Sequence, residues 1–251
     1  PTPLEEMANS AKEVGASVMY DGAHVLGLIA GGQFQDPLRE GADLMTGSSH
    51  KTFPGPQGGF LLSSSEDETF HRRLNNAMFP GVCSSYHLHH VAGKVMALAE
   101  FMEYGEAYAT DIVSNARAFA GALAAEGFDV LAESRGYTAS HQVLTRHGEL
   151  DSGAGAKAAQ RLEEAGIITN MNMLPGDTKA MTPSGLRLGV QELTRVGFSN
   201  DDMEEVASFY ARVLLHGEDP AAVRADVHAL KQQRQTIRYC FNEDERSGYP
   251  E

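Results

Sequence analysis

The chain has 251 residues, of which 42% are hydrophobic and 22% are charged, and this is enough for one large or two modest globular domains. The net charge of −14 argues against a nucleic-acid partner, because no basic stripe is present to pair with phosphates. No apolar run approaches the roughly 18 residues that a membrane-spanning helix needs, so we expect no membrane partner either.

Short apolar strands alternate with helices in the first hundred residues. Helical spacing predicts a helix over Leu4–Val14. Runs with the length and composition of strands follow at Ala16–Tyr20, Ala42–Thr46 and Gly58–Leu62. This alternation predicts an α/β fold whose sheet is mainly parallel. Ligands of such sheets bind beyond the carboxyl ends of the strands, where Asp21 and residues 48–51 fall.

A long helix and a smaller α/β layer are expected next. His87–Glu126 is Ala-rich and helical, with a break expected at Tyr104–Glu106 and with Gly127 as a C-cap. Further strands are expected at Phe128–Leu131, His141–Thr145, Ile167–Thr169 and Leu186–Gly189.

Helices are also expected in the smaller α/β layer. One is expected over Gly155–Ala165, and another begins at the cap residues Ser199–Asp202 and runs to Leu215. A polar helix and an acidic tail then end the chain. We predict domains at 1–100, 101–217 and 218–251, the last being the helical and acidic tail.

The cysteines and histidines favour no metal site. Cys83 and Cys240 lie far apart without metal-ligand spacing, so we expect free thiols and a reducing, cytoplasmic location. His87, His89 and His90 form a cluster, but no matching carboxylate or cysteine pattern accompanies it. We therefore expect no bound metal.

Lys51 carries the strongest chemical signal, because it lies among small residues at the predicted end of a strand. An ammonium must lose its proton to attack an aldehyde, and a loop that excludes water lowers its pKa. Asp21, thirty residues earlier, places a carboxylate where it would keep a pyridinium nitrogen protonated. Alone, such a lysine is usually solvated, such an aspartate usually caps a helix, and His24 would pack in the core. Their combination in order favours Schiff-base chemistry.

Several motifs resemble the cofactor signature of the serine hydroxymethyltransferases. They are Asp21–His24, Ser48–Gly59, Phe79–Gly81, Asn170–Pro175 and Ser184–Gly189. The resemblance covers about residues 1–215 with compatible spacing. It implies a pyridoxal-phosphate enzyme of fold type I. This chain would form the lysine-bearing half of the large domain and a small C-terminal α/β domain.

The resemblance also implies a role for each matching residue around the cofactor. Lys51 would form an imine with pyridoxal phosphate, Asp21 would pair with the pyridine nitrogen, and His24 would lie beside the phenolic oxygen. Ser48 would help to move the cofactor from the lysine to the substrate. His50 would support the loop and the phosphate region.

Substrate contacts follow from the same resemblance. Arg187 would clamp the substrate carboxylate, for which a planar guanidinium is suited. Asn172 matches a position near the folate pterin. Ser84 and Ser85 replace a glycine-rich stretch that reaches the phosphate across the dimer interface, and they still offer donors. This change, with Gln57 in place of a common arginine, favours a branch acting on α-methylserine or a bulkier aldehyde.

The implied activity is cleavage or formation of a C–C bond at the Cα of a small amino acid such as serine, glycine or α-methylserine. Tetrahydrofolate-dependent transfer and a folate-independent aldolase or transaldolase both remain open. A non-catalytic subunit remains open too, and an aminotransferase is less favoured. In the family, the residues that stack on the ring precede the equivalent of Pro1. We therefore expect a partner chain with the N-terminal half, and dimerisation across the active site.

Overall fold

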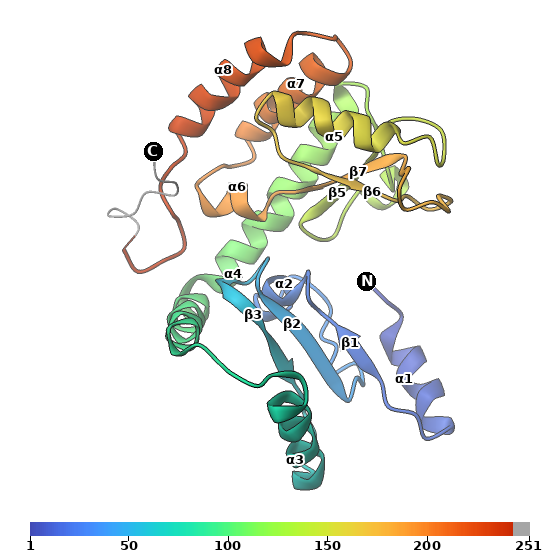
Figure 1. Cartoon of the computed structure of the whole chain (residues 1–251), viewed down its shortest axis with the longest axis vertical. Helices are drawn as coiled ribbons and strands as arrows, with labels where there is room; N and C mark the ends of the chain where they lie inside the picture. Colours follow the sequence, from blue (N-terminus) through green and yellow to red (C-terminus); the bar gives the residue numbers. More distant parts are fainter. Residues whose placement is uncertain (243–251) are drawn as a thin grey trace. The chain divides into compact units, whose positions relative to one another are not determined.

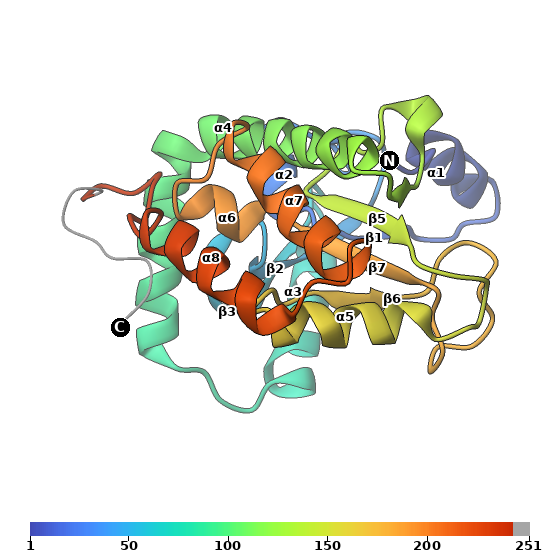
Figure 2. The same ribbon diagram turned by 90° about the horizontal axis from the view of Figure 1, so that it is seen from above.

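The computed structural model describes residues 1–242 and forms two compact units, Pro1–Ala109 and the part from Thr110 onward (Figure 1, Figure 2). Helix α4 (Leu88–Ala125) runs from one unit into the other along the chain. The domain limits expected from the sequence stay a prediction. The units are described one at a time below.

The first unit contains helix α1 (Leu4–Glu13) and a sheet in the order β1-β2-β3. Strand β1 (Met19–Asp21) pairs in parallel with β2 (Leu44–His50), and β2 pairs antiparallel with β3 (Pro54–Leu62). The α/β class is confirmed, and the sheet of this unit is mixed rather than mainly parallel.

Strand β2 continues to His50, so the expectation that it stops at Thr46 was wrong. Glycine is depleted in strands, but Gly47 pairs with Phe60 of β3, and no local sequence pattern reveals this pairing. A β carbon at Gly47 would lie 2.8 Å from Leu26 Cδ2. The glycine therefore permits close packing on Leu26.

Apolar side chains join this sheet to helices α2 (Leu26–Ala30) and α4. Phe53 stands at their centre, with ring centroids 5.4 Å from Phe60 and 5.0 Å from Phe101. The remaining members of the cluster are Leu26, Met45, Ala97, Tyr20, Ile29 and Leu38.

Helix α4 is continuous, so the predicted break at Tyr104–Glu106 is wrong. A β carbon at Gly31 would lie 2.6 Å from the carbonyl oxygen of Gly105, so this part of α4 serves close helix packing rather than a helix end. The helix ends as expected at Gly127, which has φ +101°, and Phe128 N donates to Leu123 O at 3.0 Å. Helix α3 (Glu68–Asn76), followed by the turn η1 (Ala77–Val82), was not predicted.

The second unit contains an antiparallel sheet in the order β4-β5-β7-β6. Its strands are β4 (Asp129–Val130), β5 (Gln142–Arg146), β6 (Asn170–Asn172) and β7 (Gly185–Gly189). The strand expected at Ile167–Thr169 forms later, at β6, because β6 is the segment that pairs with β7. Ile168 is 84% exposed, so the apolar run did not mark a buried strand.

Helix α5 (Ala154–Glu164) packs on β6 and β7, and it contacts α7 (Asp202–Leu214) and α8 (Pro220–Gln232). The short elements of this unit are η2 (Glu133–Arg135) and α6 (Gln191–Arg195). Part of the predicted acidic tail, residues 243–251, lies outside the described residues. Within residues 1–242, no helix has the length and hydropathy to cross a membrane.

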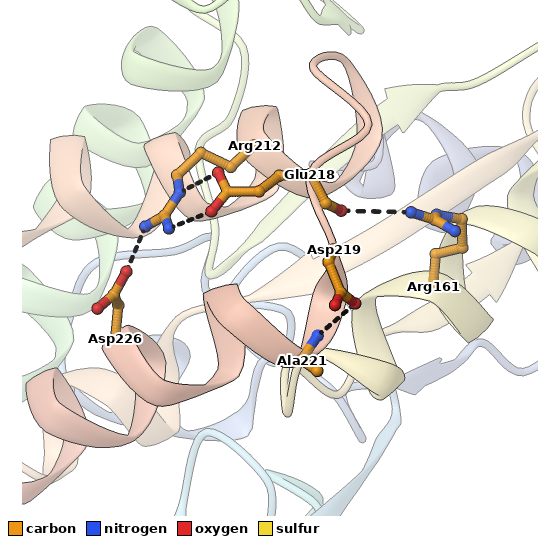
Figure 3. A network of polar contacts seen from close by, with 6 residues as sticks. All are labelled: Arg161, Arg212, Glu218, Asp219, Ala221 and Asp226. Atoms are coloured by element: carbon orange, nitrogen blue, oxygen red, sulfur yellow. Dashed lines mark hydrogen bonds and ion pairs between the residues drawn. The ribbon is translucent and has the colours of Figure 1, made fainter.

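Arg212 of α7 joins its own helix to α8 and to the loop between the two helices (Figure 3). Its Nε and Nη2 donate to the Glu218 carboxylate at 2.8 and 2.7 Å, and its Nη1 donates to Asp226 of α8 at 2.8 Å. Arg161 of α5 donates to the Glu218 carbonyl at 3.5 Å, and the Asp219 carboxylate caps α8. This bidentate pair has the geometry in which an ion pair stabilises a fold.

We expect Arg212→Gln to lower the Tm by about 2–4 °C, because it removes both ion pairs. The matched control is Arg39→Gln, since the Arg39 side chain is 90% exposed and makes a single pair with Asp36. Differential scanning calorimetry in low salt measures both variants. Equal Tm values for Arg212→Gln and Arg39→Gln would contradict the stabilising role of Arg212.

Candidate active site

Lys51 follows β2 directly and begins the turn to β3. Its Nζ lies 3.4 Å from Nε2 of His24, in the segment between β1 and α2. Both residues are half-buried. At this distance the two nitrogens share a hydrogen bond whose direction depends on the imidazole tautomer, so His24 orients the lysine nitrogen.

Thr52 holds this turn against the His24 segment, and the sequence analysis did not identify it. Its buried Oγ1 donates to His24 O at 2.9 Å and accepts from Gly27 N at 3.0 Å. A β carbon at Gly27 would lie 2.2 Å from the Thr52 carbonyl oxygen, so only glycine permits this approach. A threonine beside a loop lysine carries no sequence signal, because its partners are distant in the chain.

Asp21 ends β1, and in the parallel pair it stands opposite Thr46 of β2. Its Oδ1 accepts hydrogen bonds from Ala23 N at 2.9 Å and from Thr46 Oγ1 at 3.4 Å. These bonds fix a carboxylate at the carboxyl end of β1, and Lys51 follows the carboxyl end of β2. The parallel pairing thus puts Asp21 and Lys51 at the same edge of the sheet.

Ser48 and His50 lie on the last part of β2. Ser48 is half-buried and pairs with Gly59 of β3. His50 Nδ1 lies 3.3 Å from both the nitrogen and the oxygen of Gly58, and the tautomer decides whether it accepts or donates. Both residues therefore belong to the hairpin that carries Lys51.

Ser84 and Ser85 are exposed and follow η1. Within residues 1–242, neither serine makes a hydrogen bond, and none connects them to Lys51. Their expected contact with a phosphate stays a prediction.

The histidine cluster precedes and begins α4. The ring centroids of His87, His89 and His90 lie 4.5–5.6 Å apart. Burial, then the neighbouring histidines and Lys94, lower the pKa of His90. Among the residues that the structure describes, no group of three His, Cys, Asp or Glu side chains is arranged to hold a metal ion. Cys83 and Cys240 are free thiols, as expected.

Arg187 and Asn172 lie in the second unit. Arg187 of β7 stands opposite Asn170 of β6, and Asn172 stands opposite Gly185. Because alternate residues of a strand share a face, Arg187 and Asn172 are diagonal neighbours on one face of the sheet. Leu186, on the other face, is buried.

The two side chains differ in their bonding. Asn172 Nδ2 donates to Met173 O at 2.6 Å. The half-buried guanidinium of Arg187 makes no ion pair within residues 1–242, so its donors are available to an anion.

We expect Thr52→Val to lower the free energy of unfolding by about 1–3 kcal/mol, because the buried Gly27 N–H and His24 carbonyl lose their partner without a change in volume. Thr52→Ser keeps the hydroxyl and serves as the control. Urea denaturation measures both variants. A Thr52→Val protein as stable as Thr52→Ser would show that these bonds do not hold the turn.

Known proteins are similar to this chain over most of its length. Residues 3–210 match the family described as serine hydroxymethyltransferase. The serine hydroxymethyltransferases of Thermococcus kodakarensis and Pyrococcus abyssi are each 58% identical to the chain, over 245 and 246 residues. Each match covers 96% of this chain and 57% of the relative, so the chain spans a little over half the length of these relatives.

A solved structure supports the same relationship. The crystal structure of L-threonine transaldolase from Pseudomonas fluorescens, in its internal aldimine state, is 32% identical, with a TM-score of 0.88. The match covers 96% of this chain and 54% of that chain, which confirms the expected fold. With the matched family region spanning most of its length, the chain belongs to the serine hydroxymethyltransferase family.

Proposed function

We propose that the chain supplies the lysine-bearing part of a pyridoxal-phosphate enzyme that makes or breaks a C–C bond at the Cα of serine, glycine or a related small amino acid. The observation that carries this proposal is the contact of Lys51 with His24 at the sheet edge where Asp21 ends its strand. The names of the 58% identical relatives and the internal aldimine state of the transaldolase support it.

The residues at this edge fit pyridoxal phosphate by the chemistry of their donors and acceptors. Lys51 offers a primary amine for the aldehyde, and Asp21 offers a carboxylate for the pyridine nitrogen. Ser48, near the end of β2, has a small side chain that leaves room for a flat ring beside it. Pyridoxal phosphate supplies an electron sink that stabilises negative charge at the substrate Cα.

Each side chain at this end of the sheet has a proposed role that follows from its chemistry. Lys51 would bind the cofactor and exchange a proton at Nζ, while His24 orients that nitrogen and would contact the phenolic oxygen of the cofactor. Asp21 holds a proton on the ring nitrogen through its charge. Ser48 would assist the exchange of the cofactor between Lys51 and the substrate, and His50 would support the phosphate region.

Four further positions complete the assignment. Arg187 binds the substrate carboxylate with its planar guanidinium, and Asn172 contacts the substrate or a folate beside it. Ser84 and Ser85 donate to the phosphate. Asn172 and the two serines are the positions for which the geometry offers least support, since Asn172 bonds its own neighbour and the serines are exposed.

We also propose that further polypeptide, on a partner chain or on a longer version of this one, covers the first unit and completes the site. That unit exposes many large apolar side chains, and such a surface marks an interaction site. Examples with more than half of their surface exposed are Phe79, Val82, Tyr86, Leu88, Val95 and Met102. The part of the relatives outside their match with this chain is a natural occupant. Dimerisation across the site belongs to the same proposal.

A folate-independent transaldolase is the second candidate, and the similarity to L-threonine transaldolase favours it. Aldehyde release from a β-hydroxy amino acid separates the two activities. A rate that depends on tetrahydrofolate supports the hydroxymethyltransferase, and an equal rate without folate supports the aldolase or transaldolase.

Borohydride reduction of the cofactor-saturated holoenzyme, followed by peptide mapping, should place the pyridoxyl label on Lys51. Lys51→Arg keeps the charge but cannot bind the aldehyde, so it should abolish the label, whereas Lys12→Arg on α1 should retain it. Label on another lysine of the wild-type protein would contradict the proposal.

We expect Arg187→Lys to weaken glycine binding roughly 10- to 100-fold, because a lysine cannot form the bidentate contact. Arg146→Lys is the matched control, since Arg146 lies on the same sheet and already pairs with Asp129 at 3.2 Å. Titration of the cofactor absorption with glycine measures both dissociation constants. Unchanged binding in Arg187→Lys would remove Arg187 from the substrate site.

A further inference from the structure

The loop between β6 and β7 is tied at both ends to one carboxylate, that of Asp177. Its Oδ2 accepts hydrogen bonds from Leu174 N at 2.9 Å, Ser184 N at 3.0 Å and Ser184 Oγ at 2.8 Å. Leu174 follows β6 closely and Ser184 directly precedes β7, and both residues are buried. A single oxygen therefore joins the end of one strand to the start of the next.

Asp151 adds a second tie from a neighbouring loop. Its backbone nitrogen donates to Asp177 Oδ1 at 2.7 Å. Its own carboxylate accepts from Thr178 N and Lys179 N at 2.8 Å and from Thr178 Oγ1 at 2.7 Å. The two aspartates thus cross-link both loops without an ion pair among the described residues.

Asp177 is held in its charged form. Burial alone raises the pKa of its carboxyl, but hydrogen bonds from Leu174, Ser184 and Asp151 outweigh burial, so the net pKa lies below its usual range. The carboxylate is therefore an acceptor for all of its bonds at neutral pH.

The short pairing of β6 makes this tie necessary for the register. Strand β6 has three residues, so the ladder alone fixes its position against β7 weakly. At the start of β7, a β carbon on Gly185 would lie 2.4 Å from Leu174 Cγ. The residue that Asp177 holds thus also packs onto the first residue of β7.

We propose that Asp177 is a positioning residue that sets the spacing of Asn172 and Arg187 on their shared sheet face. Asn172 lies two residues before Leu174, and Arg187 lies three residues after Ser184. Release of the carboxylate frees both strand ends, and the guanidinium loses its alignment with the substrate carboxylate. This inference rests on the proposed role of Arg187.

The test is the ratio of affinities for glycine and glycinamide in the holoenzyme, measured by titration of the cofactor absorption. Asp177→Asn should weaken glycine binding roughly tenfold and leave glycinamide, which has no carboxylate, almost unchanged. A merely structural role would lower the Tm and leave this ratio intact. Asp151→Asn is the matched control, because it removes the charge of the carboxylate that accepts from Thr178 and Lys179 and spares the bonds of Leu174 and Ser184 to Asp177.

Arg187→Lys, measured in parallel, separates the two proposals. An unchanged ratio in Arg187→Lys overturns the role of Arg187 itself. A reduced ratio in Arg187→Lys with an unchanged ratio in Asp177→Asn overturns the positioning role alone. If Asp177→Asn does not fold, Ser184→Ala decides, since it removes one of the bonds to Asp177. A reduced ratio then supports the inference and a wild-type ratio overturns it.

Discussion

The buried hydroxyl of Thr52 accepts a hydrogen bond from Gly27 and donates one to His24, and these two bonds hold the β2–β3 turn against the segment that follows β1. They keep this turn, and with it the nitrogen of Lys51, close to the segment that carries the imidazole of His24. The approach also requires a glycine at position 27. The chemistry proposed for Lys51 thus depends on a contact between residues that are far apart in the chain.

In the second unit, a carboxylate rather than a hydroxyl fixes the position of a short strand. Strands β1 and β6 each have three residues, which is too short for the ladder to fix their positions firmly. In the first unit, the Thr52 hydroxyl holds the segment that follows β1. In the second unit, the Asp177 carboxylate joins the end of β6 to the start of β7. Because these strands are short, hydrogen bonds outside the strand ladders define where the side chains next to the strand ends lie.

Local sequence patterns predicted which helices and strands are present better than they predicted the first and last residues of each. The residues Asp21, His24 and Lys51 could be named from order and chemistry, and the structure brings His24 and Lys51 into contact. The end of β2 and the continuity of α4 could not be predicted, because Gly47 leaves room for Leu26 and Gly31 leaves room for the carbonyl oxygen of Gly105. Thr52 escaped notice because its partners His24 and Gly27 are distant in the chain, and Asp177 escaped notice because its bonds to Ser184 and Asp151 follow from the folding of two loops. The roles of Ser84, Ser85 and Asn172 remain predictions from the family resemblance.

A crystal structure of the holoenzyme with pyridoxal phosphate tests the central claim most directly. We expect the cofactor to be joined to Lys51 Nζ, with the Asp21 carboxylate within hydrogen-bond distance of the ring nitrogen and with the Thr52 bonds to His24 and Gly27 intact. A cofactor joined to another lysine, or a ring nitrogen without the Asp21 carboxylate beside it, would contradict the account.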